Sequence, residues 1–426
     1  MTRLPIVTWS NIHFPILNNS DDATVDSDVL TSTCEARSNS SQGLDELPRE
    51  RIVYVAPDCT ETGVKKRAHG FVGLGHELTC FSFRRDRYNV GYQPDWPNVE
   101  LGKTEERRIF SRVFAGLKAI AIIFLHRRTW REATMIYVRN LDLVLLALVG
   151  KAITRSRAPL VYQILDIHPT FLKRGLLGAV MRWLERRVLK RCEMLVVTSP
   201  AFLRNYFEPV QRFQGKAFVL ENKWPREGVF NDTRKLQFDL DQDRPVWTIG
   251  WLGNIRCEKS LEVLTELADA LPDRVRIYVR GYASYLGEGK LHRAIEGRAN
   301  MVFEGEYDAP NDLPEILAKI HFNWCVDFSG YENGIWLLPN RIYEGGYFGI
   351  PALAIASHET GRIVKQRHLG FTLDEPYVEN LRELLLKMTC EDYLQLRRGI
   401  EEQPVANFVD TGDLEKLINI ALSANR

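Results

Sequence analysis

Short runs of apolar and β-branched residues alternate with amphipathic segments along residues 51–225. Such runs, bounded by turns, are typical of buried strands, and the segments of helical period between them are typical of helices that cover a sheet. The runs are RIVYVAP (51–57), ELTCFSF (77–83), MIYVR (135–139), LVYQILD (160–166), MLVVTS (194–199) and AFVLEN (217–222). The alternation predicts βα units on a parallel sheet.

The same alternation restarts after residues 223–245, a polar, proline-punctuated segment that we interpret as a linker. The expected strands are VWTIGWLG (246–253), RVRIYVRG (274–281), NMVFEG (300–305), HFNWCVDF (321–328) and PALAIA (351–356), with helices at 260–271 and 313–320. The fold is therefore predicted to be of the α/β class, with two Rossmann-like doubly wound domains facing a cleft.

Domain boundaries follow from these patterns. Residues 15–50 are rich in Asn, Ser, Thr and Asp and show no period, so residues 1–50 are predicted to be a disordered N-terminal tail. Residues 51–225 would form the first domain and residues 226–404 the second. Residues 405–426 are expected to form a C-terminal helix that could pack back on the first domain.

Composition narrows the class of protein. The 426 residues are 45% hydrophobic and 26% charged, which fits two or three domains with cores of their own. The seven cysteines are scattered without a CxxC pair, which argues against disulfides or a zinc site and for a reducing compartment. No secretion signal is visible, and the most apolar stretches, 119–125 and 141–150, are too short to span a bilayer. We expect a cytoplasmic, non-spanning protein.

Charge is unevenly distributed, although the net charge is only +1. Residues 51–225 carry 30 basic and 15 acidic side chains, whereas residues 226–426 carry 23 basic and 32 acidic ones. Stretches at 84–87, 107–131 and 173–191 mix Arg and Lys with apolar residues, which is typical of helices drawn to anionic lipid. Solvated helix faces are the alternative. No nucleic-acid motif is present, so an anionic membrane surface is the favoured partner.

The segment PNRIYEGGYFGIP, residues 339–351, predicts a short helix between two prolines. Asn340 is a good N-cap, so the helix should begin near Arg341. A helix N-terminus at the carboxyl edge of a parallel sheet offers N–H groups to a phosphate, and Arg341 would add a guanidinium. Glu344, an acceptor-only group, suits a pair of ribose hydroxyls. A capped surface helix with a solvated Glu344 is the alternative.

A second anion site is predicted in WLGNIRCEKSLEVL, residues 251–264. A strand ends at Gly253, the next loop carries Arg256 and Lys259, and a helix should begin at about Ser260. Cations at a helix start oppose the helix dipole, so their placement costs stability unless an anion is bound. Ordinary loop charges are the alternative.

Two loops of the first domain carry further candidates. Asp166 and His168, in LDIHP (165–169), can move protons near neutral pH and could deprotonate or orient a substrate hydroxyl. The alternative is that Asp166 caps the next segment and His168 is a wall residue. The loop PDCTETGVKKR (57–67) places Gly63 and Lys65 before a helix. It lacks GxGxxG, so we interpret it as a loop facing the cleft rather than a dinucleotide site.

Together these motifs resemble the GT-B nucleotide-sugar glycosyltransferases, in particular the large retaining family that builds bacterial polysaccharides. The similarity covers about residues 51–400. PNRIYEGGYFGIP matches that family's P-x-[KR]-x-x-E-x-x-x-x-G-x-P segment at each fixed position, and WLGNIRCEKS corresponds to its strand–Gly–loop–Lys segment. The stretch NRIYEGG is also similar to members of rhizobial exopolysaccharide pathways.

The resemblance implies roles for individual residues. Lys259, with Arg256 beside it, would neutralise the donor diphosphate, and Glu344 would bind the ribose. Gly253 would let the backbone approach the donor, and Tyr307, in EGEYDAPNDL (304–313), would neighbour the base. On the acceptor side the resemblance points to Gly63, Lys65, Asp166 and His168.

Two positions depart from the family pattern. Asn254 stands where the family often has Arg after the glycine, and Arg256 is the expected substitute. Trp336 stands where a second Glu would lie eight positions before Glu344, and Glu332 is the nearby candidate for part of that role.

The implied activity is transfer of a sugar from a nucleoside diphosphate sugar to a hydroxyl of a lipid-linked or oligosaccharide acceptor, at the inner face of the plasma membrane. No metal ion or other cofactor is expected, because no DxD metal clamp is identified: the carboxylate cluster FDLDQD (238–243) lies in the predicted linker and lacks the glycine and terminal Glu of a calcium loop. A retaining reaction would follow a front-side route assisted by the leaving phosphate, whereas an inverting one would use Asp166 as base. Three alternatives stay open: a sugar-nucleotide epimerase of the same fold, a metal-dependent GT-A transferase and a non-catalytic sugar-binding protein.

Overall fold

The computed structural model describes residues 49–85, 91–103, 109–225, 244–283, 286–309, 311–328 and 331–423. Side chains are not described at 109–114 and 331–333. Apart from Arg49 and Glu50, the predicted N-terminal tail lies outside the described residues, and so do residues 226–243 of the predicted linker. Among the helices described, none combines the length and the apolar character that crossing a membrane requires.

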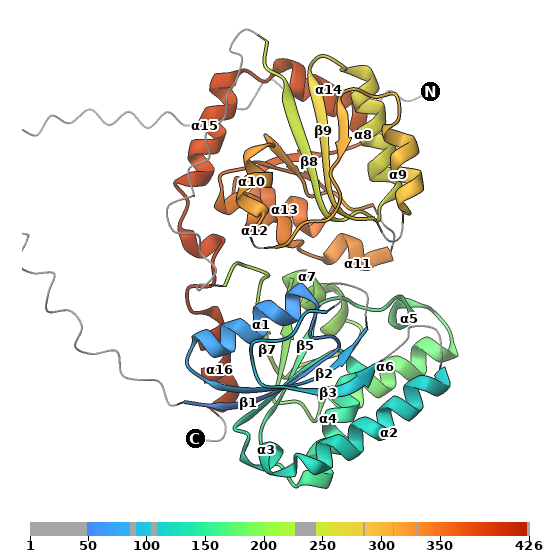
Figure 1. Ribbon diagram of the computed structural model, residues 1–426, viewed down its shortest axis with the longest axis vertical. Coiled ribbons are helices and arrows are strands. Elements are labelled where there is room, and N and C mark those ends of the chain that lie inside the picture. Colours follow the sequence, from blue (N-terminus) through green and yellow to red (C-terminus); the bar gives the residue numbers. More distant parts are fainter. Residues whose placement is uncertain are drawn as a thin grey trace, which may run out of the picture. The chain divides into compact units, whose positions relative to one another are not determined.

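The first sheet is parallel throughout and has the strand order β3-β2-β1-β4-β5-β6-β7 (Figure 1). Its strands are β1 (Arg51–Ala56), β2 (Glu77–Arg84), β3 (Asn98–Lys103), β4 (Met135–Arg139), β5 (Leu160–Ile164), β6 (Met194–Val197) and β7 (Lys216–Val219). All six strands expected from the apolar runs are present. The sequence missed β3, a polar strand that pairs only with β2 at the edge of the sheet.

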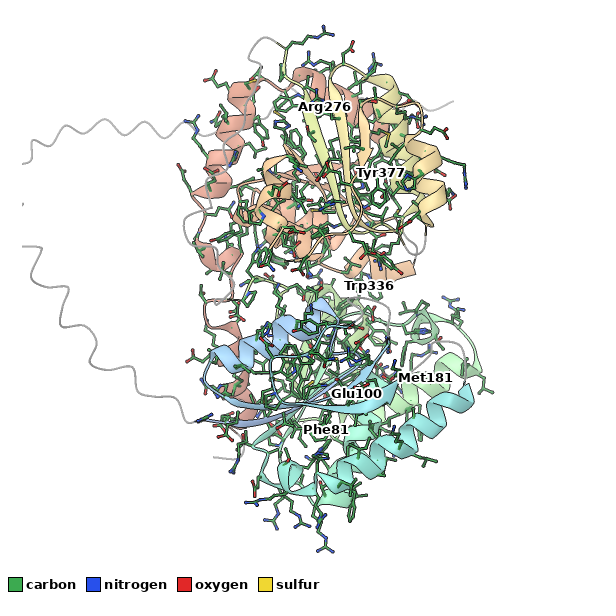
Figure 2. All side chains as sticks on the ribbon, in the orientation of Figure 1. Phe81, Glu100, Met181, Arg276, Trp336 and Tyr377 are labelled. Atoms are coloured by element: carbon green, nitrogen blue, oxygen red, sulfur yellow. The ribbon has the colours of Figure 1, made fainter. Side chains whose placement is uncertain are left out.

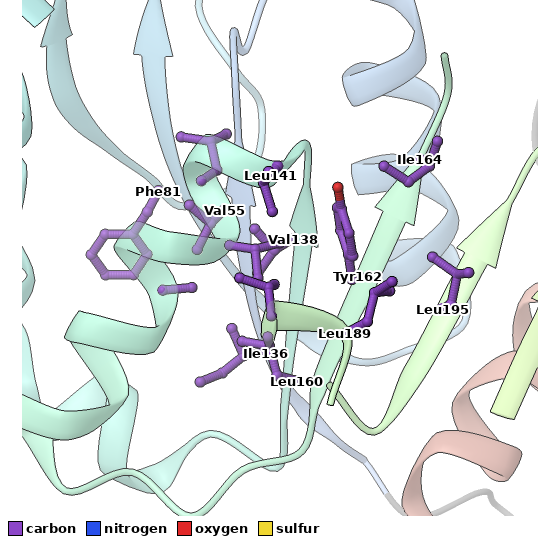
Figure 3. Packing of buried hydrophobic residues seen from close by; sticks show 14 of the residues in the cluster. Val55, Phe81, Ile136, Val138, Leu141, Leu160, Tyr162, Ile164, Leu189 and Leu195 are labelled. Carbon is purple, nitrogen blue, oxygen red and sulfur yellow. The ribbon is translucent and has the colours of Figure 1, made fainter. Parts of the chain in front are cut away.

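The alternation of side chains along β1 builds two cores. Val53 and Val55 belong to one apolar cluster, and Tyr54 belongs to a second, because successive side chains of a strand point to opposite faces. Figure 3 shows the first cluster, in which Val55, Ile136 and Val138 pack beneath helices of the first domain. The helices are α1 (Thr62–Gly73), α2 (Ile109–Leu125), α3 (Arg127–Glu132), α4 (Leu141–Thr154), α5 (Pro169–Leu172), α6 (Leu176–Leu189) and α7 (Pro200–Phe202), which continues into the π-helix η1 (Leu203–Phe207).

The second sheet is also parallel, with the order β10-β9-β8-β11-β12-β13. Its strands are β8 (Trp247–Asn254), β9 (Val275–Tyr282), β10 (Met301–Phe303), β11 (Phe322–Trp324), β12 (Ala352–Ile355) and β13 (Gly370–Leu373). The helices of this domain are α8 (Glu258–Ala270), α9 (Glu288–Ile295), α10 (Leu313–Ala318), α11 (Tyr331–Trp336), α12 (Asn340–Tyr347), α13 (Glu359–Gln366), α14 (Tyr377–Lys387) and α15 (Cys390–Glu401). One cluster unites α8, α9 and α14 with the sheet, and another unites α10, α12 and α13 with it.

The end of the chain returns to the first sheet. After the 3-10 turn η3 (Val405–Asn407), helix α16 (Asp413–Leu422) places Leu414, Leu417 and Ile418 in the same cluster as Tyr54 of β1. The returning segment pairs with the segment that leaves the first sheet, because Trp224 N–H donates to the carbonyl of Phe408 (2.8 Å) and Asp410 N–H donates to that of Trp224 (2.7 Å). Two chain passages therefore run side by side between the sheets.

Candidate active site

The carboxyl end of β8 is shaped by glycine. Gly253 has a φ of +93°, and the nearest atom to a Cβ built there is the Tyr307 hydroxyl, at 3.9 Å. Positive φ is costly for residues with a Cβ, so glycine at this position lets the backbone turn and leaves open space in front of it. Asn254 follows as the last residue of the strand and is exposed. Tyr307, predicted to neighbour a bound base, therefore lies beside the predicted donor turn.

Helix α12 begins one residue earlier than the sequence predicted. Asn340 is its first residue, Pro339 occupies the N-cap position, and the Asn340 side chain makes no capping hydrogen bond, so the N-cap prediction for Asn340 is wrong. The extended backbone of Pro339 explains the shift, since proline has no N–H to lose at a helix start. Asn340 instead lines a cavity of about 230 Å³.

Arg341 ties α12 to the sheet. One guanidinium N–H donates to the carbonyl of Trp324 at the end of β11 (2.7 Å), and the Asn323 side-chain amide donates to the carbonyl of Arg341 (2.9 Å). These bonds fix the first turn of the helix against the strand, so that part of the Arg341 guanidinium is already engaged with protein. Because these bonds hold Arg341 in place, its other guanidinium N–H groups can contact a ligand only from this fixed position.

Glu344 lies one turn into α12, partly buried between cations. Burial raises the pKa of its carboxyl group, while Lys66 and Arg341 oppose that rise. No N–H or O–H from the described part of the chain donates to this carboxylate. The Tyr307 hydroxyl is close enough that Glu344, after burial, contributes to raising its pKa. A partly buried carboxylate with open acceptor positions is suited to paired ligand hydroxyls.

Lys66 of α1 is a functional candidate that the sequence placed in a basic cluster with Lys65 and Arg67, although only Lys65 was predicted as a site residue. Its ammonium donates to the carbonyl of Asn222 (2.7 Å), and burial lowers its pKa to about 8, with Glu344 opposing the shift. Lys65, the predicted residue, instead holds its ammonium 3.8 Å from the centre of the Tyr92 ring. A signal was available: Gly63, Lys66 and Gly70 follow helical spacing and share one face of α1, whereas Lys65 lies off it.

The two predicted diphosphate ligands are paired with carboxylates. Arg256 donates twice to one Asp327 oxygen (2.6 and 3.1 Å), and Lys259 contacts Glu375 at 3.2 Å. Helix α8 begins at Glu258 rather than Ser260, because the Cys257 sulfur accepts from the Ser260 N–H (3.3 Å) and acts as the N-cap. Lys259 thus belongs to the first helical turn.

Aromatic rings also hold Lys259. Its ammonium lies 4.9 Å from the centre of the Phe328 ring and 5.1 Å from that of Tyr377, which is labelled in Figure 2. Both cations keep a large exposed fraction, 38% for the Arg256 side chain and 48% for that of Lys259. An incoming anion can therefore replace their carboxylate partners without rebuilding the core.

The predicted proton-transfer residues of the first domain are exposed. His168 is the N-cap of α5, with its ring nitrogen accepting from the Thr170 N–H (3.3 Å), so the capping role falls to His168 and not to Asp166. Asp166 lies near Glu61, whose pKa is raised chiefly by burial and slightly by Asp166. Gly63 sits in α1 where a Cβ would lie 3.4 Å from the Arg139 guanidinium.

The comparison with curated proteins decides the family. The chain is 31% identical over 373 residues to the succinoglycan biosynthesis protein ExoL of Rhizobium meliloti (strain 1021), a match that covers 86% of this chain and 92% of ExoL. The chain belongs to the ExoL family. The sequence matches no protein-family model. The expected similarity to a rhizobial exopolysaccharide pathway is confirmed.

Solved structures show which fold this ExoL relative has. Sucrose-phosphate synthase from Thermosynechococcus elongatus superimposes with a TM-score of 0.66 at 12% identity, covering 88% of this chain and all of that one. HepE of Anabaena, solved with UDP and glucose, has a TM-score of 0.63 at 14% identity, with coverage of 88% and 100%. The predicted α/β fold with two Rossmann-like domains, GT-B, is confirmed. A GT-A enzyme would have a different fold, so that alternative is wrong.

In this ExoL family member the predicted residues fall into three groups. Gly253, Tyr307, Arg341 and Glu344 lie together, joined by Lys66 from the first domain. Arg256 and Lys259 form a second group with their acidic partners. Gly63 and Asp166 belong to a third, around Glu61 and Arg139. The side chain of Glu332 lies outside the described part of the chain, so its predicted role is not placed.

Proposed function

We propose that this ExoL family protein is a glycosyltransferase of polysaccharide biosynthesis, which transfers a sugar from a nucleoside diphosphate sugar to a glycan hydroxyl. The observation that carries the proposal is the Glu344 carboxylate, placed at the start of α12 between Lys66 and Arg341 and free to accept ligand hydroxyls. The family relationship to ExoL and the UDP and glucose bound in HepE support it.

In the proposed reaction the bond between the anomeric carbon and the departing phosphate oxygen breaks. A bond forms from the acceptor oxygen to that carbon, and the hydroxyl proton leaves to the departing phosphate or to a base such as Asp166. Negative charge accumulates on the diphosphate, so the barrier falls where cations and helix N–H groups are already fixed around it. Arg256 and Lys259, at the start of α8, are the residues proposed to supply that charge.

The acidic partners of these cations fit the same mechanism. Asp327 and Glu375 neutralise Arg256 and Lys259 when no donor is bound, which avoids leaving two cations unpaired at the site. A diphosphate offers more negative charge than either carboxylate and would take over these contacts. We propose that protein cations do this without a metal ion; unchanged turnover in EDTA is the expected result, and loss of turnover restored by Mg²⁺ would contradict it.

The acceptor is proposed to be presented at a membrane. Leu176 is 83% exposed and Trp183 is 52% exposed on α6, and Leu125, at the end of α2, is 72% exposed. Both helices pack on α4, and the Arg187 guanidinium lies over the Trp183 ring. Apolar side chains rimmed by cations match the interface of an anionic bilayer. We therefore propose a lipid-linked acceptor and a peripheral location at the inner face of the plasma membrane.

The central test is donor binding by the variant Glu344→Gln. Removing the charge weakens two hydrogen bonds to a ribose, which should lower nucleotide affinity by about 10- to 100-fold. Calorimetric titration with UDP and with GDP would measure this, alongside turnover of the corresponding radiolabelled sugars with lipid extract. Glu262→Gln, an exposed change on α8, is the matched control. Equal nucleotide affinity in Glu344→Gln and the wild type would remove Glu344 from the donor site and defeat the proposal.

A further inference from the structure

A buried arginine with two unsatisfied guanidinium nitrogens lines the cavity of about 230 Å³ beside α1. Arg139, the last residue of β4, is 3% exposed, and its Nε and Nη1 have no hydrogen-bond partner among the described residues. Its closest carboxylate is that of Glu61, 3.7 Å from Nη1, which is beyond hydrogen-bond distance. The ion pair with Glu61 offsets part of the cost of burying this guanidinium, and two of its nitrogens still lack a hydrogen-bond acceptor among the described residues.

A second arginine shares the cavity and the same deficit. Arg67, on the face of α1 that carries Gly63 and Lys66, lines the cavity, and its Nε is buried without a partner. The buried hydroxyl groups of Tyr54 and Tyr137 lie next to Arg139 and Arg67 respectively, outside the lining of the cavity. Two buried guanidinium groups with unsatisfied nitrogens thus line one cavity, which is typical of a site built for a polar ligand.

Two of the three acidic residues that line the cavity, Glu221 and Asp410, are engaged elsewhere, and Glu415 is the third. Glu221 receives two hydrogen bonds from Arg367 (2.7 and 3.0 Å). Asp410 accepts from the backbone N–H groups at the start of α16, the nearest at 2.6 Å from Asp413 N–H. Lys66 points to the carbonyl of Asn222, so it adds positive charge without competing for the space. The lining carries four cations, Lys66, Arg67, Arg139 and Lys223, against three carboxylates, two of which already accept hydrogen bonds from the protein, so its charge favours an anion.

The cavity opens toward the predicted acceptor residues. Gly63 and Leu165, which directly precedes Asp166, both belong to its lining. A Cβ at Gly63 would stand 3.4 Å from Arg139 Nη2, so glycine there keeps the approach to the guanidinium open. Helix α1, labelled in Figure 1, lies on the same cavity as Arg139 at the end of β4 and Leu165 just after β5. An anion held on Arg139 would lie on the acceptor side of the proposed reaction.

We infer that this cavity is a subsite for an anionic group of the acceptor, a phosphate or a carboxylate, held by Arg139 and Arg67. The inference rests on the proposed function because it names an acceptor. The presence of an anion site does not depend on that function. Two guanidinium groups supply enough donors for the oxygens of a phosphate or a carboxylate, and binding would pair their unsatisfied nitrogens.

The test measures anion binding while the donor site is filled. The wild type is saturated with UDP, or with GDP if that is the nucleotide it binds, so that added anions cannot occupy the diphosphate position. Inorganic phosphate, glucose 1-phosphate, glucuronate and neutral glucose are then titrated at constant ionic strength. We expect glucose 1-phosphate or glucuronate to bind and glucose not to bind. Binding of the phosphate ester alone would identify a phosphate-bearing acceptor, and binding of glucuronate alone a carboxylate-bearing one.

Variants assign the binding to the cavity. Arg139→Gln and Arg67→Gln should each weaken binding by about tenfold or more, since each loses a charge-assisted donor pair. Arg276→Gln, an exposed arginine on β9 labelled in Figure 2, should bind as the wild type does. If Arg139→Gln does not fold, the anion affinity of Arg67→Gln tests the subsite by itself. Anion affinity that is unchanged in Arg67→Gln, or absent in the wild type, would overturn the subsite.

The same experiment separates the subsite from the proposed function. Nucleotide binding that depends on Glu344, with no anion binding in the cavity, would overturn only the subsite. Anion binding without any nucleotide binding would overturn the proposed function and, with it, the assignment to an acceptor. Binding of inorganic phosphate alone would overturn that assignment as well, because an acceptor group carries a sugar.

Discussion

Glu185 is a buried acid that no part of the proposed reaction uses. It is 2% exposed on α6 and accepts hydrogen bonds from the Tyr206 hydroxyl (2.6 Å), the Gln211 amide (2.5 Å) and the Tyr162 hydroxyl (3.3 Å). Burial raises its pKa to about 7, although these hydrogen bonds oppose the rise. Its neighbours come from β5, from the π-helix η1 and from the turn after it, so the network joins three segments of the first domain.

This acid makes stability depend on pH. Between the unfolded pKa near 4.5 and the folded value of about 7, the folded protein keeps a proton that the unfolded chain releases. The free energy of unfolding should therefore fall as the pH rises through this window, by roughly 2–3 kcal/mol from this group. Glu185→Gln should lose that dependence in urea unfolding at pH 5 and 8, while Glu262→Gln keeps it. Identical profiles for Glu185→Gln and the wild type would contradict the argument.

Two glycines at the donor turn should respond differently to substitution. A Cβ at Gly281 would lie 1.9 Å from the carbonyl oxygen of Gly253, so Gly281→Ala forces β8 and β9 apart at their carboxyl ends. A Cβ at Gly253 meets nothing closer than 3.9 Å, so Gly253→Ala should cost only the strain of its positive φ, about 1–2 kcal/mol. Urea unfolding should rank Gly281→Ala as clearly less stable; equal losses would show that strain alone governs both sites.

At the scale of elements, the apolar pattern predicted the strands that are buried on both faces. Strand β4 is buried at all five residues, and its run MIYVR was identified. Strands β3 and β13, each at one edge of its sheet, were missed because the apolar run is short or absent, and only one residue of each strand is buried. The alternation of apolar runs therefore predicted the parallel architecture and the edge strands β7 and β10, but it did not reveal the edge strands β3 and β13.

The site was predictable in type and less so in detail. Glycine, Arg, Lys and Glu at fixed spacing marked the segments that form the strand ends and the starts of α8 and α12. The pairing of Arg256 with Asp327 depends on contacts 71 residues apart in sequence, which a local pattern does not contain. The choice between Lys65 and Lys66 depends on which way α1 is rotated, and that follows from packing on β1 rather than from the basic cluster itself.

Helices α2 and α6 should carry membrane binding. The double variant Leu176→Gln, Trp183→Gln removes two largely exposed apolar side chains without touching the core, so its affinity for vesicles containing phosphatidylglycerol should fall about tenfold or more. Sedimentation at low ionic strength would measure this, and added salt should weaken the wild type steeply. The control, Leu394→Gln with Ile420→Gln, changes two exposed apolar residues of α15 and α16. Equal sedimentation of the double variant and the wild type would place membrane contact elsewhere.

At the scale of the whole molecule, the first domain is completed by residues that follow the second domain in sequence. The two passages between the sheets are joined by backbone hydrogen bonds at Trp224 and by the ion pair of Lys223 with Asp413 (2.8 Å). Beyond them, α16 covers β1 and β4 together with α1. The first domain therefore cannot bury its second core until residues 413–422 have been made.

This dependence predicts where a core mutation on α16 will act. Leu417 has no exposed surface, so Leu417→Ala should destabilise the protein by about 2–5 kcal/mol. Ile420, on the same helix, is 41% exposed, and Ile420→Ala should have a much smaller effect. Hydrogen exchange should speed up in Leu417→Ala at Ile52 and Tyr54 of β1, because opening of α16 uncovers their face of the sheet. The amides of β8 should keep their protection, since none of their side chains shares that cluster. Faster exchange in β8 that matched β1 would mean instead that the two domains unfold as one unit.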